Sequence, residues 1–140
     1  MIETFDKQRL ATITIVLDAF LLYVFTNYTL KYFDFLFIIV IFILHFSFYI
    51  ALYNDFFVLL DYLHYSVFIS LGVSIFLDNI WLLFTVLLLL VIIQSLWITE
   101  DKCILLHSDS GISFGYDKEL QYAVLLYTVI ISGKIGNLIN

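Results

Sequence analysis

The chain has 140 residues, of which 64% are hydrophobic and 13% are charged, with a net charge of −6, one cysteine and no proline. A soluble domain carries about 25% charged residues and needs polar side chains to cover its surface, so the composition excludes an ordinary soluble domain and a disordered chain. The single cysteine excludes a disulfide scaffold, and the few basic residues exclude a typical nucleic-acid-binding protein. We therefore expect an all-α membrane protein.

Four apolar stretches are long enough to cross the bilayer as helices, which takes roughly 20 residues each. They cover residues 10–28, 32–53, 56 or 61 to 77, and 80–99, with short polar breaks between them. Short breaks predict that neighbouring helices are antiparallel. Helices are favoured over a barrel because runs such as 86–93 do not alternate in polarity. Residues 1–99 are therefore expected to form a transmembrane bundle.

The remaining residues differ from the four spans. Residues 100–119 are rich in charge, serine and glycine, which predicts a polar loop. Residues 120–132 are apolar again but too few to cross the bilayer. We expect them to form a short interfacial helix, or a helix docked on a partner. The expected fold is thus four transmembrane helices followed by a short C-terminal interfacial helix.

Four crossings place both termini on the same side of the membrane. Five of the six basic residues fall on that side and Lys31 falls on the other, which predicts termini in the cytoplasm or the mitochondrial matrix. No basic transit peptide precedes the first span. The abundance of Phe, Tyr and Ile, whose codons are AT-rich, suggests an organellar or large-DNA-virus gene. A protein encoded in an organelle needs no import presequence.

Two ionisable residues are expected deep in the membrane. Asp18 lies eight residues inside the first span and His45 lies eight residues before the end of the second. At 1.5 Å per residue, both are about 12 Å deep from the same side. A direct or water-bridged pair would lower the cost of burying each group. Such a pair is a satisfied structural contact, a contact to a neighbouring subunit, or a proton relay or cofactor ligand.

A second polar group is expected at the membrane edge. Asp61 and His64 are one helical turn apart, Tyr62 and Tyr65 flank them, and Arg9 lies at the same level. One interpretation makes Asp61 an interfacial cap and the tyrosines part of the aromatic belt. The other makes the cluster a hydrogen-bonding site for a polar headgroup such as a quinone carbonyl.

Other polar residues in the spans predict packing contacts. Ser66, Ser70 and Ser74 recur every four residues, which favours close approach of another helix. Gln94 is expected to form a hydrogen bond with another helix.

The sequence predicts no metal centre and no self-contained enzyme. Cys103 and His107 are four residues apart, but a zinc site needs about four ligands. The chain has no phosphate-binding loop, nucleotide fingerprint or nucleophile elbow, which argues against a hydrolase or transferase.

Two short segments carry a resemblance to a known family. The segment QRLATI at residues 8–13 resembles the Gln-Arg motif that opens the first helix of succinate dehydrogenase membrane anchors, especially the D-type subunit. The segment VLLDYLH at residues 58–64 is similar to the Asp-Tyr-Val-His segment after the second helix of mitochondrial D-type anchors. The resemblance covers roughly residues 8–77, and both segments lie on the side of the termini.

The resemblance implies a non-catalytic subunit of an oxidoreductase in the mitochondrial inner membrane. Arg9 and Tyr62 would lie near ubiquinone, with Asp61 supporting that edge of a site shared with partner subunits. Other membrane anchors, soluble redox subunits carrying an iron–sulfur cluster, and lipid are the implied partners. The family's haem-ligand histidine lies eleven residues before the aspartate, where this chain has Ile50. Ligation of haem b by His45 would need a shifted register and is left open, and four spans exceed the family's three.

Two other functions compete with this interpretation. The chain is alternatively a structural accessory protein of another respiratory complex or of a viral membrane, binding its neighbours by shape alone. An ion channel or transporter would rest on Asp18 and His45, but the spans lack the helix breaks typical of transport sites.

Overall fold

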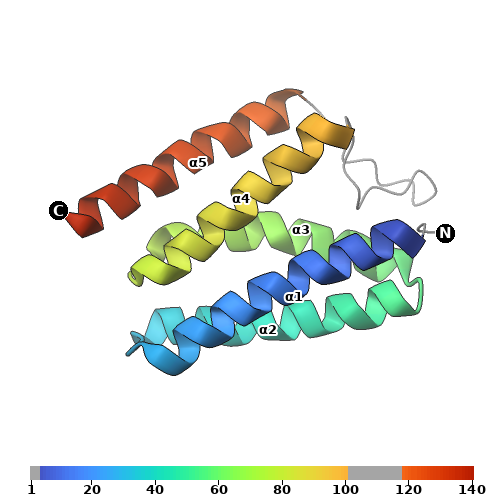
Figure 1. Cartoon of the computed structure of the whole chain (residues 1–140), viewed down its shortest axis with the longest axis horizontal. Helices are drawn as coiled ribbons and strands as arrows, with labels where there is room; N and C mark the ends of the chain where they lie inside the picture. The colour runs from blue at the N-terminus through green and yellow to red at the C-terminus, as the bar shows by residue number, and fades with distance from the viewer. Residues whose placement is uncertain (1–3, 101–117) are drawn as a thin grey trace.

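The computed structural model describes residues 4–100 and 118–140, which form a bundle of helices (Figure 1). The helices are α1 (Thr4–Asn27), α2 (Tyr32–Tyr53), α3 (Phe57–Val73), α4 (Ile80–Glu100) and α5 (Lys118–Ile139), and a 3-10 turn, η1 (Ser74–Phe76), continues α3. The described residues contain no strand. The all-α class and the four helices predicted over residues 1–99 are confirmed.

Short polar side chains explain where the helices break. The Asn54 side chain donates to the carbonyl of Ile50 at the end of α2, and Asp55 adopts a positive φ of 55° that aspartate tolerates better than most residues. Before α4, the Asn79 side-chain oxygen accepts hydrogen bonds from the amides of Trp81 and Leu82 at 2.9 and 3.2 Å. Asn79 therefore satisfies amides that have no partner within the helix.

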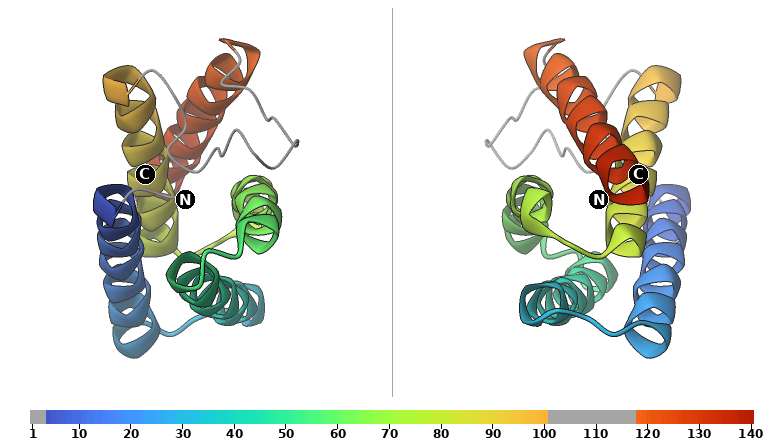
Figure 2. Two further views of the ribbon diagram at one scale, coloured as in Figure 1. Left: turned by 90° about the vertical axis from the view of Figure 1, so that its right-hand side faces the viewer. Right: turned by 90° about the vertical axis from the view of Figure 1, so that its left-hand side faces the viewer.

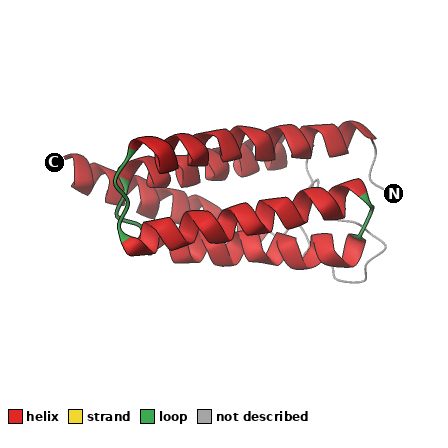
Figure 3. Ribbon diagram, turned by 90° about the horizontal axis from the view of Figure 1, so that it is seen from below, coloured by secondary structure: helices red, strands yellow, loops and turns green. Residues whose placement is uncertain are grey.

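The helices pack in a defined order around the bundle. α1 contacts α2 and α4, α2 contacts α3, and α5 contacts α4. The end-on views in Figure 2 show α4 beside α1 and α3 beside α2. The loops after α1 and after α3 lie together at one end of the bundle, opposite the loop that joins α2 to α3 (Figure 3).

Large apolar side chains also cover the outside of the bundle. Ile15 on α1, Phe46 on α2, Ile69 on α3, Ile98 on α4 and Leu126 on α5 are all more than half exposed. In water an apolar surface of this extent would drive association. All five helices are long and apolar enough to cross a membrane. The chain therefore has the character of a multi-pass membrane protein.

The C-terminal helix differs from its prediction. A short helix over residues 120–132 was expected, but α5 has 22 residues, and its stretch Gln121–Ile139 is long enough to span a membrane. The helix does not end at residue 132, because Ile131 and Ile135 stay buried in the core and Lys134 Nζ donates to the Ile75 carbonyl. The predicted polar loop 100–119 is shorter, since its ends belong to α4 and α5, and its residues 101–117 lie outside the described part.

Because α5 is longer than predicted, the C-terminus lies farther along the bundle than the prediction placed it. α1 begins at one end of the bundle and α5 finishes at the other (Figure 1). Lys134 therefore lies with Lys31, whereas Lys7, Arg9 and Lys118 lie at the opposite end. The excess of basic residues at the end of the bundle that holds the N-terminus is therefore smaller than the four-helix prediction required. An arrangement with both termini on one side does not follow from five helices of this length.

Candidate functional site

An acid–histidine pair lies inside the bundle between α1 and α2. Asp18 Oδ1 is 2.5 Å from Nδ1 of His45, so the two residues that the sequence singled out are in direct contact. The Tyr49 hydroxyl donates to the other oxygen, Asp18 Oδ2, at 3.0 Å. Sequence analysis missed Tyr49, although its spacing of four from His45 places both on one face of α2. Both carboxylate oxygens of Asp18 therefore have partners.

His45 is held by one ring nitrogen and leaves the other available. Its side chain is 21% exposed, and Nε2 has no hydrogen-bond partner among the described residues. His45 also lines an apolar cavity that is partly open to the outside of the bundle. Asp18 and Tyr49 therefore hold the imidazole in place while its second nitrogen remains free to bind a ligand.

The cavity has a volume of about 180 Å³ and is lined by α1, α2, α3 and α4. Its walls are mainly leucine, isoleucine, valine and phenylalanine, and its lining residues with polar side chains are Thr14, His45, Ser66, Ser70 and Thr85. An apolar cavity of about 150 Å³ is known to bind benzene. One six-membered ring is therefore of a size that this cavity can hold.

Ser70 lines this cavity and differs from the other hydroxyl residues of the spans in its hydrogen bonding. In the described spans, the other serine and threonine hydroxyls donate to carbonyls of their own helix. Ser66, one turn away on the same wall, donates to the Leu63 carbonyl at 2.6 Å. Ser70 has no hydrogen bond among the described residues. The cavity thus has two available polar groups, His45 Nε2 and Ser70 Oγ.

The serine stripe therefore has two roles along α3. Ser74 donates to the Leu71 carbonyl and lies 3.2 Å from the Tyr127 hydroxyl of α5, which fits the predicted packing role. Ser66 and Ser70 instead line the cavity. The predicted interhelical hydrogen bond of Gln94 is confirmed, since its side chain donates to Thr128 of α5 at 2.6 Å.

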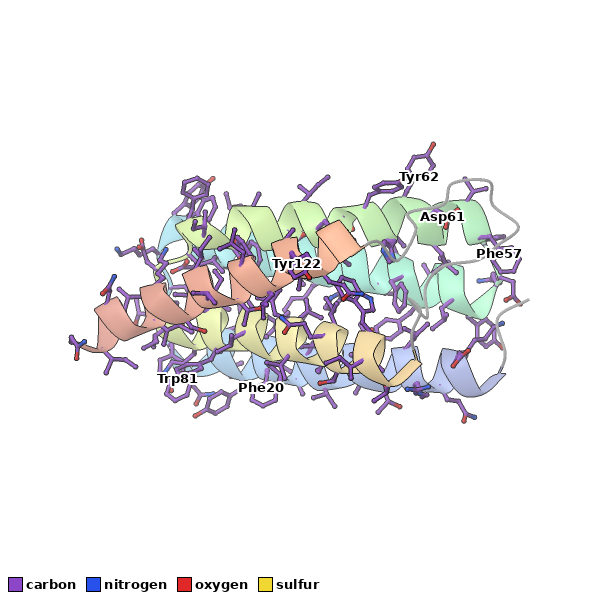
Figure 4. All side chains as sticks on the ribbon, turned by 90° about the horizontal axis from the view of Figure 1, so that it is seen from above. Phe20, Phe57, Asp61, Tyr62, Trp81 and Tyr122 are labelled. Carbon is purple, nitrogen blue, oxygen red and sulfur yellow. The ribbon has the colours of Figure 1, made fainter. Side chains whose placement is uncertain are left out.

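Asp61 and Tyr62, two of the residues predicted at the membrane edge, differ in their exposure. Asp61 is 8% exposed, and its Oδ2 has no hydrogen-bond partner among the described residues. Tyr62 is 64% exposed and points away from the bundle (Figure 4). Arg9 lies 3.7 Å from Asp6 on its own helix. The outward position of Tyr62 suits an aromatic belt, while Asp61 keeps a buried oxygen available on the inner side.

A polar network ties two loops together at the opposite end. Lys31 forms an ion pair with Asp78 at 2.9 Å, and the Asp78 amide donates to the buried carboxylate of Asp34 at 3.0 Å. The hydrogen bond and charge of Asp78 raise the pKa of Lys31. Lys31 in turn lowers the pKa of Asp78. These contacts join the loop before α2 to the loop before α4 and bring no group to the cavity.

The described residues contain no group of three His, Cys, Asp or Glu side chains placed to hold a metal ion. Cys103 and His107 lie outside the described part of the chain. Ligation of haem by His45 stays a prediction, to which the structure adds one ring nitrogen beside the cavity. Neither a family model nor a curated protein nor a solved structure matches the chain.

Proposed function

We propose that the chain is a multi-pass subunit of a membrane complex and binds the ring of a quinone-class ligand in the cavity between α1, α2, α3 and α4. The observation that carries the proposal is an apolar cavity with two available polar groups, His45 Nε2 and Ser70 Oγ. Ligand sites commonly combine apolar walls with a few placed polar groups. A quinone has the same distribution, with a flat apolar ring and a carbonyl on each of two opposite edges.

The size of the cavity also favours a ligand over a purely structural role. Unfilled volume costs about 24 cal/mol per Å³ in closed soluble cores, so this partly open cavity of about 180 Å³ would cost at most roughly 4 kcal/mol when empty. Helix association in lipid depends strongly on packing, which makes such a loss hard to offset. A bound ring would restore the missing contacts.

A second candidate site lies at the membrane edge and is supported by the buried, unpartnered oxygen of Asp61. Arg9 and Asp61 would form its inner side, while Tyr62 would contribute through a surface shared with a partner subunit. In this arrangement ubiquinone binds between subunits.

At its most specific, the proposal is a divergent succinate dehydrogenase anchor in the mitochondrial inner membrane. The two segments at residues 8–13 and 58–64 support it. The soluble redox subunits would supply electrons, and the quinone would carry them onward. The competing proposal is a structural accessory subunit, which the extensive exposed apolar surface of all five helices would also suit.

Binding of decylubiquinone to the purified chain in lipid nanodiscs tests the two sites. A Ser70→Leu variant fills the cavity, whereas Tyr62→Phe alters the membrane-edge site and leaves the cavity untouched. Binding that is lost in the first variant and kept in the second supports the cavity. The reverse pattern moves the site to the membrane edge, and a wild-type chain that binds no quinone refutes a quinone site within this chain.

Native purification in mild detergent, with mass spectrometry of comigrating proteins, tests the complex. Flavoprotein and iron–sulfur subunits of succinate dehydrogenase would support the anchor. Comigration with another respiratory complex, or with viral structural proteins, would favour the accessory role.

A further inference from the structure

Resting on the proposed quinone site, we infer that His45 Nε2 and Ser70 Oγ donate hydrogen bonds to the two carbonyl oxygens of the ligand, and that the cavity therefore selects the oxidised quinone over the quinol.

The pair can be uncharged overall in two ways. In one, Asp18 is a carboxylic acid that donates from Oδ1 to Nδ1 of a neutral imidazole, whose proton is on Nε2. In the other, a carboxylate faces an imidazolium that carries protons on both nitrogens. Both arrangements leave Asp18 Oδ2 free to accept from Tyr49, as the geometry requires. In both, Nε2 carries a proton and is a hydrogen-bond donor.

Only a pair with a net charge of −1 would leave Nε2 without a proton. That state combines a carboxylate with a neutral imidazole protonated on Nδ1. A net charge inside the bilayer is costly, and among the lining residues none besides His45 is ionisable, so no cation on the cavity wall compensates the charge. His45 therefore offers the cavity a donor. This donor pairs better with a carbonyl oxygen than with the hydroxyl of a quinol, whose oxygen is a weaker acceptor and whose proton finds no acceptor at Nε2.

Ser70 is suitably placed for the second carbonyl. It lies 13 residues into α3, about 20 Å along the axis, whereas His45 lies about 12 Å from the same end of α2. The two polar groups are thus separated by about 8 Å along the bundle axis on neighbouring helices. A quinone ring with carbonyls on opposite edges spans such a separation through one hydrogen bond at each end.

The test compares decylubiquinone with decylubiquinol, held reduced under argon, in nanodiscs containing the wild-type chain. We expect the quinone to bind about tenfold more tightly than the quinol, in line with one well-formed hydrogen bond. Equal binding, or tighter binding of the quinol, overturns the inference about His45 while the proposed function stands. Absence of binding by either ligand overturns the proposed function itself and the inference with it.

Two pairs of variants assign the donors. Asp18→Asn keeps the donor, since the Asn oxygen accepts from Tyr49 while its amide donates to Nδ1, so the preference for quinone persists. Asp18→Ala removes the partner of His45 Nδ1, so the proton of the imidazole is no longer held on Nε2. The ratio of the quinol and quinone dissociation constants should then fall toward 1.

On α3, Ser70→Ala should weaken quinone binding about five- to tenfold. Ser66→Ala serves as the matched control, because the Ser66 hydroxyl already donates to a backbone carbonyl. Equal losses in the two serine variants contradict the role of Ser70, and circular dichroism checks that each variant keeps its helical content.

Discussion

The contact between Asp18 and His45 makes a quantitative prediction for the stability of the bundle. The perturbation is a double-mutant cycle that comprises Asp18→Ala, His45→Ala and the combined variant. A cycle isolates the pairwise term from the other effects of each substitution. The structure gives a 2.5 Å contact between two side chains that are each less than a quarter exposed.

Two ranges of hydrogen-bond energies limit the coupling energy expected between Asp18 and His45. Hydrogen bonds that involve a charged group contribute about 1.5–3 kcal/mol in soluble proteins. Hydrogen bonds between transmembrane helices average about 0.6 kcal/mol and reach about 1.7. Because the contact is short and Tyr49 holds the second oxygen of Asp18, we expect a value near the top of the membrane range, about 1.5 kcal/mol.

The assay is reversible unfolding in mixed micelles with increasing dodecyl sulfate, followed by circular dichroism. A parallel cycle on Lys31 and Asp78 serves as the control, since this ion pair is largely exposed and should show little coupling. Additive effects of the two substitutions at Asp18 and His45, with a coupling below about 0.3 kcal/mol, would refute the reasoning that the pair stabilises the bundle.

Further predictions concern the cavity, a helix cap, a surface ion pair and the topology. Ser70→Leu should raise the free energy of unfolding by about 1 kcal/mol because it fills part of the cavity, and unchanged or lower stability would contradict an empty space there. Asn79→Ala should lower stability by about 1 kcal/mol through loss of the cap of α4, measured by the same unfolding assay. Asp78→Asn should lower the melting temperature only slightly at pH 7, because the ion pair is largely exposed, and not at all at pH 2. The pKa of Asp78 is below its usual 3.8, so the contribution of the ion pair is present above that value and is lost as the pH falls through the lowered pKa. In a Cys103→Ser background, single cysteines at positions 4 and 140 should react with impermeant reagents from opposite sides of the membrane, and labelling from one side would contradict five crossings.

The cavity and the polar pair together explain why polar groups occur within such an apolar chain. Asp18 and Tyr49 position His45, and leucine-rich walls line the space beside it. Since α5 contributes no residue to the cavity, the first four helices suffice to build the site. α5 is instead attached to the outside through Gln94 and through Tyr127, whose hydroxyl donates to the Leu71 carbonyl.

The sequence by itself determined the membrane class and the first four helices. Long apolar runs separated by Asn54 and Asp55, or by Asp78 and Asn79, allow few other folds in lipid, since backbone groups must be satisfied within each helix. The depths of Asp18 and His45 also followed from counting residues, because the rise of a helix is constant.

Only the tertiary structure decided the extent of α5 and the shape of the site. The hydropathy pattern predicted that α5 ends near Ser132. Burial of Ile135 and the contact of Lys134 with η1 continue the helix, and both depend on residues distant in sequence. In the same way, the sequence alone predicted a packing role for Ser70, whereas the packed helices form a cavity that Ser70 lines. Composition and periodicity describe one helix at a time, whereas a cavity is a property of several helices packed together.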